Sequence, residues 1–580
     1  MKKSYLFFLI IVGFAQISNA QEKITWHEPK FVEGVCITDS QNIFNRLPVD
    51  LKEKVRKPVW ELSQNTAGEF IHFKTAATAI KVRYTLASNS FSMPHMPSTG
   101  ESGLDLFAID INGNWNWAPG SYHFGDTCSY TFKNLLLAKN STSVADFYLY
   151  LPLYNSVTWL SIGVDEKDSF AFASKRNEEP IVAYGTSILQ GGVTSRPGLA
   201  WTNILQRNLD RTVINLGFSG NGRFEKPVFD LMSKVNAKLY ILDCMPNLTR
   251  GFSEEEIKNR VIYGVNKLRE KNKEVPILFT EHAVGYAPFY MDTARLNEYH
   301  NSSLVIQNIF NDLQSSGVKN IYLLTDKEIG FDINSTTEGL HPNDIGMMKY
   351  AIAYEKKIRE ILNEPVGNIS TEIPIEQYRD GYDWIKRHED VIQNIEKTNP
   401  ATLLIGNSII NYWGGNPKAS LARGADEWSK YMAPIKVQNA GFGWDRIENV
   451  LWRVYHGELD HFTGKNIVLM IGTNNLGINS DREIVEGLQF LINAIKTRKP
   501  ETKIIMVGIL PRKKMEEQVK SINAKIKTMS FENHVEFVDF GKDFLKGNQI
   551  NSELFVGDGL HPNAGGYDVL GKDLMGVLKK

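Results

Sequence analysis

The chain has 580 residues and a formal net charge of -1, with 42% hydrophobic and 23% charged residues. This length exceeds that of one ordinary domain and predicts about three domains. The composition is that of a globular protein. The near-zero net charge argues against nucleic acid as a partner, because such proteins present a strongly basic field.

The first 20 residues have the pattern of a secretory signal peptide. Lys2 and Lys3 form a basic start, residues 5–14 form a short apolar core, and residues 18–20 offer small side chains for cleavage. An uncleaved anchor helix is the alternative, but the apolar run is too short to span a bilayer. We therefore expect cleavage near Ala20 and an exported protein, periplasmic or secreted, without a membrane span.

The cysteines do not suggest a disulfide framework. Cys36, Cys128 and Cys244 are odd in number and widely spaced, although a bridge between Cys36 and Cys128 remains possible. The sequence has no His/Cys cluster with the spacing of a zinc site and no phosphate-binding P-loop. We therefore expect neither a metal nor a cofactor.

Residues 21–175 are predicted to form an antiparallel β-sandwich. Short β-like runs such as 70–73 and 80–85 alternate with turn signals such as Asn112-Gly113. The aromatic residues of this region could form a sugar-stacking surface, but such residues more often belong to the core and rim of a sandwich. These residues include Trp115, Trp117, Tyr122 and Tyr148.

From residue 176 onward, apolar strands alternate with helical segments. This alternation predicts a parallel, doubly wound sheet. It runs over residues 176–365 and repeats over residues 366–580, after a connector at about 364–380, so a whole domain is repeated. The predicted strands are 180–184, 212–216, 237–243, 275–280 and 321–324 in the first copy, and 403–405, 436–439, 467–471, 503–507 and 535–538 in the second.

Each copy has a serine directly after its first strand. Ser187 lies in Gly-Thr-Ser-Ile, and Ser408 lies in Gly-Asn-Ser-Ile. Ligands of open α/β sheets bind at the carboxyl ends of the strands, so both hydroxyls are expected at the crevice. A helix N-cap is the alternative role for a serine at such a position.

Each copy also has an acid-Gly-Leu-His-Pro-Asn segment near its end. Serine and histidine are separated by 154 residues in one copy and 153 in the other, which core packing does not require. A serine hydroxyl is a weak nucleophile that needs a base within hydrogen-bond reach, and the base needs a carboxylate. The repeated spacing therefore predicts two catalytic sets. They are Ser187, His341 and Glu338, and Ser408, His561 and Asp558.

Acyl transfer also needs hydrogen-bond donors for an oxyanion. Glycine loops at 215–220 and 439–444 follow the second strand of each copy, and segments bearing Asn at 243–247 and 472–475 follow the third. Backbone N–H groups and Asn amides in these segments can serve as donors. Simple turn chemistry is the alternative explanation of the glycine loops.

These four blocks, in this order, resemble the SGNH (GDSL-type) hydrolase superfamily over nearly all of the mature chain. The second copy is similar to catalytic subunits of platelet-activating-factor acetylhydrolase. The first resembles a branch whose N-terminal β-domain carries a Gly-x-Asp-Leu-Tyr signature, matched here by Gly-Leu-Asp-Leu-Phe at 103–107. The resemblance implies flavodoxin-like α/β/α domains with nucleophiles and bases as above. It implies Gly220, Asn247, Trp444 and Asn474 as oxyanion donors.

The sequence departs from the family pattern at several positions. Glu338 replaces the usual Asp, so it either serves as a longer triad acid or leaves a Ser-His dyad steadied by a backbone carbonyl. Asn407 also stands where Asp is usual, and the block around Asn247 lacks the usual Gly-x-Asn-Asp. Trp444 occupies the position of the donor glycine; its backbone N–H suffices if unstrained, and its indole could line a small acyl pocket suited to acetyl.

The sequence therefore predicts an exported serine esterase that removes O-acetyl or other short acyl groups from polysaccharides or oligosaccharides through acyl-serine intermediates at two sites. A lipid-directed acyl hydrolase is one alternative. The other is a single active domain, with the first SGNH domain serving as a binding module. The sugar, the position deacylated and the oligomeric state are not specified by the sequence.

Overall fold

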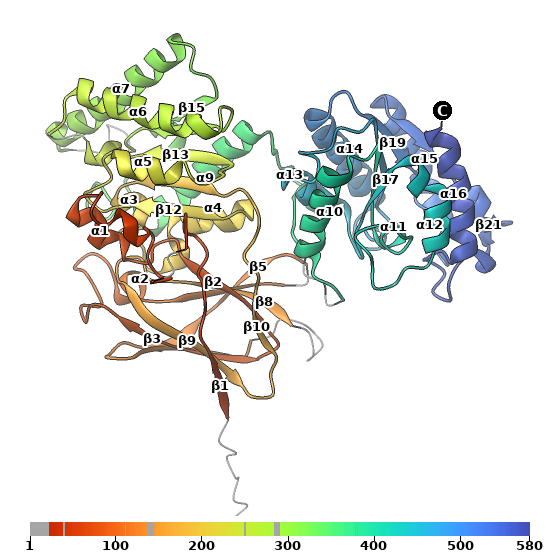
Figure 1. Ribbon diagram of the computed structural model, residues 1–580, viewed down its shortest axis with the longest axis horizontal. Helices are drawn as coiled ribbons and strands as arrows, with labels where there is room; N and C mark the ends of the chain where they lie inside the picture. Colours follow the sequence, from red (N-terminus) through yellow and green to blue (C-terminus); the bar gives the residue numbers. More distant parts are fainter. Residues whose placement is uncertain are drawn as a thin grey trace, which may run out of the picture.

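The structure is a computed structural model that describes residues 23–38, 41–110, 112–135, 144–248, 251–283, 291–377, 379 and 381–579. The predicted signal peptide lies outside these residues. Figure 1 shows two lobes, one with antiparallel sheets beneath a parallel sheet and the other with a second parallel sheet. Among the helices that the structure describes, none is long and apolar enough to cross a membrane.

The N-terminal part consists of two five-stranded antiparallel sheets, ordered β1-β9-β3-β7-β6 and β10-β2-β8-β4-β5. In β3 the side chains of Val82 and Tyr84 are buried while Arg83 is exposed, which is the alternation of a strand with one covered face. Val82 of one sheet and Phe73 and Phe147 of the other belong to one buried core, so the sheets pack face to face. The strands are β1 Ile24–His27, β2 Phe70–Thr75, β3 Ala79–Leu86, β4 Asp105–Ile109, β5 Trp115–Ala118, β6 Gly120–His123, β7 Cys128–Lys133, β8 Ala145–Tyr150, β9 Val157–Asp165 and β10 Phe170–Phe172.

The aromatic residues of these sheets lie in the core and at its rim rather than on one open platform. Tyr148 is buried and Trp115 packs against it at a ring-centroid distance of 4.7 Å. Trp117 is half-exposed, but its indole N–H donates to Asp105 and the Arg196 guanidinium covers its ring. All three cysteines are free thiols, so the possible bridge between the first two is not formed.

Both later copies contain a five-stranded sheet in which every pairing is parallel. The orders are β12-β11-β13-β14-β15 and β17-β16-β18-β19-β20, so the first strand of each copy lies between its second and third. A crevice forms outside the carboxyl ends where the strand order reverses. The prediction of two parallel sheets is confirmed. The strands are β11 Ile181–Gly185, β12 Val213–Gly217, β13 Leu239–Asp243, β14 Ile277–Thr280, β15 Ile321–Leu324, β16 Thr402–Gly406, β17 Val437–Gly441, β18 Asn466–Met470, β19 Lys503–Val507 and β20 Glu536–Val538.

Some of the helices begin at residues whose side chains cap them. Ser253 accepts a backbone N–H at the start of α6, and Ser480 and Glu483 form a reciprocal capping box at α14. In the long helix α7 the buried stripe includes Ser302 and Ser303, which weaken its apolar period. The main helices are α1 Lys57–Ser63, α4 Trp201–Leu209, α5 Lys226–Met232, α6 Glu254–Lys271, α7 Thr293–Ser315, α9 Asp344–Leu362, α10 Trp384–Thr398, α12 Ala425–Tyr431, α13 Ile447–Tyr455, α14 Asp481–Arg498, α15 Glu516–Glu532 and α16 Ala564–Leu578.

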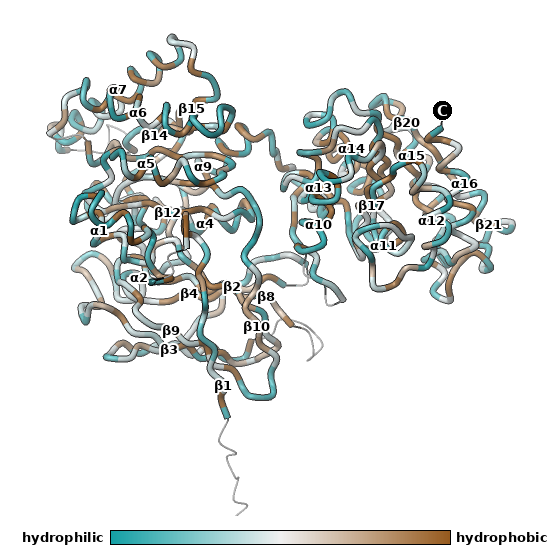
Figure 2. The backbone as a smooth tube through the Cα atoms, viewed as in Figure 1, coloured by the Kyte–Doolittle hydropathy of each residue, from teal (hydrophilic) through white to brown (hydrophobic). Residues whose placement is uncertain are grey.

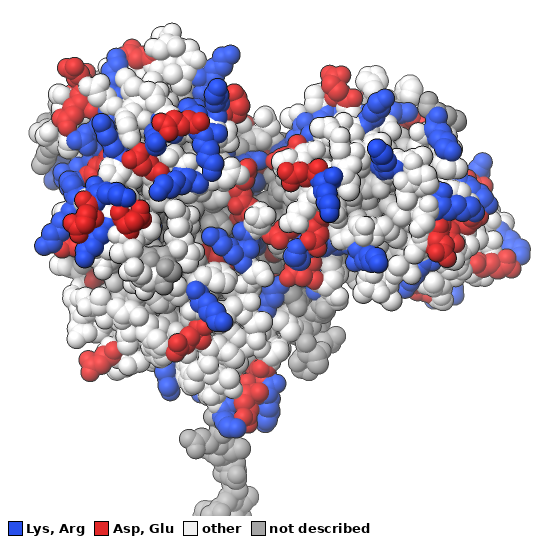
Figure 3. Space-filling view, in the orientation of Figure 1, with Lys and Arg blue, Asp and Glu red and all other residues white. Residues whose placement is uncertain are grey.

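Hydropathy follows these layers. In Figure 2 hydrophobic colour gathers in the central strands of each parallel sheet, and hydrophilic colour lies along the outer helices. Figure 3 shows cationic and anionic side chains interspersed over the face in view. This face therefore presents no extended field of a single sign.

The two lobes meet through a buried polar contact. Arg176, from the first lobe, pairs with Asp210 at 3.0 Å and with Glu376 of the connector. Asp210 also accepts the indole N–H of Trp452, from the second lobe, at 2.8 Å. Nearby, Arg211 donates to the carbonyl of Tyr455 at 3.0 Å. Buried charges of this kind are costly when one partner is removed, so the contact fixes the lobes against each other.

Candidate active sites

The first strand of each parallel sheet ends in a glycine two residues before the serine. A Cβ at Gly185 would lie 2.7 Å from the carbonyl oxygen of Asp243, and a Cβ at Gly406 would lie 2.7 Å from that of Met470. Side chains essentially never approach a carbonyl so closely. Glycine therefore permits the tight turn that carries the serine to the edge of the sheet.

The two serines begin the short helices α3, Ser187–Gln190, and α11, Ser408–Asn411, but they do not cap them. The caps are Thr186 and Asn407, whose side-chain oxygens accept the N–H two residues on at 3.3 and 2.9 Å. Both hydroxyls are therefore available for another partner. The capping bond also gives a physical role to Asn407, which stands where the family has Asp.

A histidine meets each serine at the same distance. The Oγ of Ser187 lies 2.8 Å from Nε2 of His341, and the Oγ of Ser408 lies 2.8 Å from Nε2 of His561. The serines are 7% and 4% exposed. Both histidines come from the turn before the last long helix of their copy, so the fold brings together residues distant in sequence.

A carboxylate contacts the second nitrogen of each histidine. Asp558 Oδ2 lies 2.7 Å from Nδ1 of His561, and Glu338 Oε1 contacts Nδ1 of His341. Each carboxylate also accepts backbone N–H groups of its own turn, from Leu560 at 2.9 Å and from Leu340 at 2.9 Å. The longer Glu side chain therefore reaches the position that Asp occupies in the other copy.

Both carboxylates are stabilised in their ionised form. Burial alone would raise the pKa of Glu338, but hydrogen bonds from the His341 side chain and the Leu340 backbone outweigh it and hold the pKa at about 2. At Asp558 burial also acts to raise the pKa, and bonds from the backbone and side chain of His561 lower it overall. An ionised carboxylate holds the imidazole in the tautomer whose Nε2 can accept a proton.

The residues expected as backbone oxyanion donors share one conformation. Gly220 and Trp444 both have φ of +67°, in the left-handed region. This conformation suits glycine and costs a residue with a Cβ roughly 1–2 kcal/mol. The Trp444 carbonyl accepts from Arg379 at 3.0 Å, which holds the unfavourable turn. Trp444 thus reproduces the backbone of the glycine in the first copy.

The two candidate Asn donors are oriented by neighbouring loops. Asn247 Oδ1 accepts the N–H of Gly222 at 3.1 Å, which leaves its amide nitrogen as the end that can donate. Asn474 Nδ2 donates one proton to the carbonyl of Asp445 at 3.0 Å, and its second proton remains for another acceptor. Both side chains are therefore tied to the glycine loop of their own copy.

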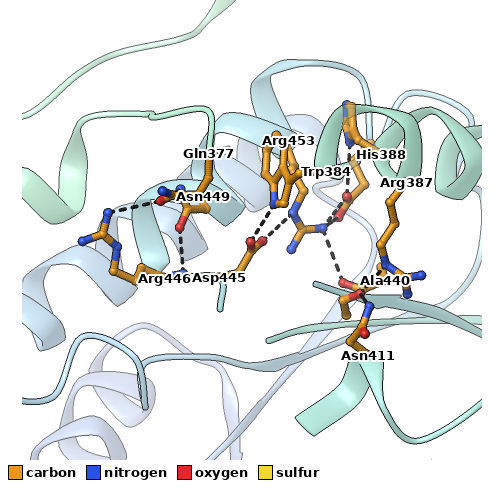
Figure 4. Close-up of polar contacts among 12 residues, drawn as sticks. Gln377, Trp384, Arg387, His388, Asn411, Ala440, Asp445, Arg446, Asn449 and Arg453 are labelled. Atoms are coloured by element: carbon orange, nitrogen blue, oxygen red, sulfur yellow. Dashed lines mark hydrogen bonds and ion pairs between the residues drawn. The ribbon is translucent and has the colours of Figure 1, made fainter. Parts of the chain in front are cut away.

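A buried network anchors the loop that contains Trp444 (Figure 4). Asp445 accepts from the Trp384 indole at 2.7 Å and from Arg453 at 3.1 Å. Arg453 is fully buried and also pairs with Glu458. Burial raises the pKa of Asp445 to about 6, although Arg453 opposes this. A loop fixed by such charge pairs holds its backbone N–H groups in place before a substrate arrives.

Loops between the antiparallel strands also approach the Ser187 site. The Tyr154 hydroxyl donates to the carbonyl of Ser187 at 3.2 Å, and the His95 ring centroid lies 6.2 Å from that of His341. Asp105, from the Gly-Leu-Asp-Leu-Phe block, accepts the N–H of Gly198 at 2.9 Å and pairs with Arg196. These contacts were missed by sequence reasoning, because nothing in the local pattern of Tyr154 or His95 points to a distant serine.

Each arrangement contains a hydroxyl beside a base and a base beside a carboxylate, as acyl transfer requires. We expect Gly220, Asn247, Trp444 and Asn474 to supply the oxyanion donors. Asn475 belongs to the scaffold instead, because its oxygen accepts the N–H of Ile447 at 3.1 Å in the buried interior. Within the ranges that the structure describes, no group of three or more His, Cys, Asp or Glu side chains is placed to hold a metal ion.

Comparison with known proteins places this chemistry in a family. Residues 178–359 and 404–569 each match a model of the GDSL-like lipase/acylhydrolase family, and residues 24–170 match a model of the N-terminus of SGNH-hydrolase-type esterases. Platelet-activating factor acetylhydrolase IB subunit alpha2 of Rattus norvegicus is 29% identical over 196 residues, which cover 33% of this chain and 81% of that protein. The human alpha1 subunit is 23% identical over 210 residues, which cover 35% of this chain and 87% of that protein.

A solved structure shares the fold over more than half of the chain. A protein described as a GDSL-like lipase from Bacteroides ovatus is 31% identical, with a TM-score of 0.53, and covers 59% of this chain and 98% of its own. The regions that match the family models contain both Ser-His-acid arrangements and the antiparallel sheets that precede them in the chain. The chain therefore belongs to the GDSL-like lipase/acylhydrolase family and is an ester hydrolase with two such domains behind a GxDLY-type N-terminal domain.

Proposed function

We propose that this chain is an exported serine esterase that removes O-acetyl groups from polysaccharides through acyl-serine intermediates at two sites. The observation that carries the proposal is the pair of hydrogen-bonded chains from serine through histidine to carboxylate, both with an Oγ–Nε2 distance of 2.8 Å. Independent copies with the same distances, built on different acids, are best explained by a shared chemical requirement.

The reaction follows from the geometry. The Ser408 Oγ attacks the ester carbonyl carbon while its proton passes to Nε2 of His561, and Asp558 stabilises the imidazolium. The carbonyl oxygen becomes an oxyanion that accepts from the backbone N–H of Trp444 and the amide of Asn474. Collapse breaks the bond to the sugar oxygen, which takes the proton from Nε2. Water then attacks the acyl carbon while Nε2 of His561 takes its proton. Collapse breaks the bond to the Ser408 Oγ, which recovers the proton from Nε2 as acetate is released.

The Ser187 site would follow the same steps with its own residues. His341 is the base, Glu338 is the acid, and Gly220 and Asn247 supply the oxyanion donors. The contact between Glu338 and Nδ1 supports a complete triad over a dyad steadied by a backbone carbonyl.

Several observations support acetyl and a glycan as the parts of the substrate. The relatives that share a third of the chain are named acetylhydrolases. The Lys2 to Ala20 segment has the pattern of an export signal. A cleft of about 690 Å³ beside the Ser408 site is lined by aromatic and polar side chains, as ligand sites commonly are.

A lipid-directed acyl hydrolase is the second candidate, favoured by the same relatives, whose name specifies a phospholipid mediator. A third arrangement keeps catalysis at Ser408 alone and makes the first hydrolase domain a binding module. Both differ from the proposal in measurable ways, because the first requires activity on long acyl chains and the second requires that Ser187 be dispensable.

The test is to prepare Ser187→Ala, Ser408→Ala and the double variant and to measure acetate release from acetylated xylan, mannan and pectin. Each single variant should keep the activity of the remaining site, and the double variant should lose at least about a thousandfold. Unchanged release in the double variant would refute the catalytic assignment. Loss in Ser408→Ala alone would identify the first domain as non-catalytic, and activity only on long-chain esters would favour the lipid alternative.

A further inference from the structure

A cleft of about 690 Å³ adjoins the Ser408 site, within the range of about 300–1,000 Å³ typical of small-molecule sites. Asn411 and Tyr412, at the end of the short helix that Ser408 begins, line it. The Tyr412 ring centroid lies 5.4 Å from that of His561. Ser408 itself does not line this space, so the cleft is a neighbouring site for the part of a substrate that does not react.

Three aromatic side chains gather at one end of the cleft. Tyr382, Tyr412 and Trp444 all line it. The two tyrosines meet at Gly443, where an added Cβ would lie 3.3 Å from the Tyr382 ring and 3.7 Å from the Tyr412 hydroxyl. Trp444 is the next residue, and 66% of it is exposed. A large exposed indole therefore lines this cleft.

Trp444 adopts a backbone conformation that is unfavourable for tryptophan. The residue adopts φ of +67°, where the first copy has Gly220, and an added Cβ at Gly220 would have nothing within 4 Å. Arg379 holds the carbonyl of Trp444 at 3.0 Å, and the Tyr382 hydroxyl holds that of Gly443 at 3.0 Å. Strained conformations that the surrounding structure enforces are concentrated at functional sites.

Three of the cations that line the cleft, Arg379, Lys386 and Arg387, are bonded within the protein, and the fourth, Lys418, is exposed. Arg387 donates to the carbonyls of Gly441 and Pro417, both at 2.8 Å. Lys386 pairs with Asp390, another residue of the lining. A ligand here therefore meets aromatic faces together with hydrogen-bonding groups, which is the combination that a sugar ring requires.

A second cavity of about 320 Å³ continues the cleft towards the antiparallel sheets. The two cavities share lining residues, so they adjoin one another. The shared residues are Arg379, Tyr382, Asp383 and Lys386. The second cavity reaches His72 and Asp146, on strands β2 and β8. We expect a chain of several sugar residues to extend from the cleft towards this adjoining cavity.

We propose that the Trp444 indole stacks against a neutral pyranose ring of the substrate and that the cleft binds the sugar residues next to the acetylated one. The apolar C–H face of a pyranose packs on an aromatic face, while its hydroxyls bond to polar groups around the ring. This inference rests on the proposed function of the Ser408 site and assigns Trp444 a role in specificity in addition to its backbone N–H.

The test compares Trp444→Gly with Trp444→Phe, both in a Ser187→Ala background so that only the Ser408 site acts. Glycine suits φ of +67° and keeps the backbone N–H, so this variant removes the indole without disturbing the turn. The measurement is the ratio of kcat/KM on acetylated xylo-oligosaccharides to kcat/KM on 4-nitrophenyl acetate. This ratio should fall about tenfold in Trp444→Gly through a higher KM, and Trp444→Phe should retain most of it. Trp159→Ala, which removes a partly exposed Trp on β9, should leave the ratio unchanged.

A binding measurement keeps this inference separate from the proposed function. With both serines changed to Ala, calorimetric titration with the same oligosaccharides should show about tenfold weaker binding for Trp444→Gly. If Trp444→Gly hydrolyses acetyl esters with an unchanged ratio of the two kcat/KM values, the inference about Trp444 is wrong. The proposed function is then unaffected. If the oligosaccharides bind through Trp444 but the protein with both serines intact shows no esterase activity, the proposed function is wrong instead. Tighter, salt-sensitive binding of pectin fragments would refute a neutral ligand.

Discussion

The Ser187 and Ser408 sites share one chain of hydrogen bonds but differ in what surrounds it. At Ser187 loops of the N-terminal part contribute Tyr154 and His95 to the neighbourhood of the serine. At Ser408 the corresponding space is an open cleft beside Trp444. The comparison separates the geometry of the reacting groups from that of their surroundings. The Oγ–Nε2 distance is the same in both copies, whereas the residues around it differ.

The acids give the largest expected effect. Changing Glu338 to Gln or Asp558 to Asn, each in the background where only its own serine remains, should lower kcat about ten-thousandfold, because an amide favours the wrong histidine tautomer. Rates with 4-nitrophenyl acetate measure both. If Glu338→Gln keeps more than a tenth of the activity, the first site works as a dyad and the two sites differ in mechanism.

The oxyanion donors should come next. Asn247→Ala and Asn474→Ala should each lower kcat by about 10²–10³ at their own site while KM changes little. Asn475→Ala is the matched control, since this residue holds the buried backbone of Ile447 and should affect thermal stability more than the reaction itself. A loss below threefold for Asn247→Ala would remove that residue from the site.

A buried acid distinguishes the two sheets and makes the first sensitive to pH. Gly185 pairs with Asp243, whereas Gly406 pairs with Met470. Burial raises the pKa of Asp243 from 3.8 to about 7, although the Tyr354 hydroxyl acts to lower it. The folded value lies above the unfolded one. The stability that this group contributes is therefore complete below the unfolded pKa and is lost as pH rises through the folded one.

The Asp243→Asn variant tests this difference. Between about pH 5 and pH 8, the wild type should lose roughly 2–3 kcal/mol of stability relative to the variant. Denaturant titrations across this range, followed by a probe in the first lobe, give the comparison. Parallel pH profiles for the two proteins would show that Asp243 titrates alike in the folded and unfolded chains.

The smallest expected effect concerns the wall of the Ser187 site. Tyr154→Phe removes one hydrogen bond to the Ser187 carbonyl, worth about 1 kcal/mol, and should lower kcat there about fivefold. Activity in the Ser187→Ala background, which reports on Ser408, should be unaffected. Equal losses at both sites would point to a general loss of folding.

The sequence predicted both parallel sheets because short apolar strands alternate with longer helical segments. The predicted strands 321–324 and 503–507 match β15 and β19. It also identified the residues that meet at each serine, because the same spacing occurs twice. Interactions between distant segments were out of reach. The contact of Tyr154 with Ser187 depends on how the sheets dock, and the left-handed turn at Trp444 depends on Arg379, which lies 65 residues away in sequence.

The central claim is that Ser187 and Ser408 are both nucleophiles. A reactive phosphonate ester that forms a stable bond to activated serines, followed by peptide mass spectrometry, tests it directly. Both serines should be labelled in the wild type, and His561→Ala should abolish labelling at Ser408 while leaving Ser187 labelled. Labelling at neither serine, or persistent labelling of Ser408 without His561, would contradict the account.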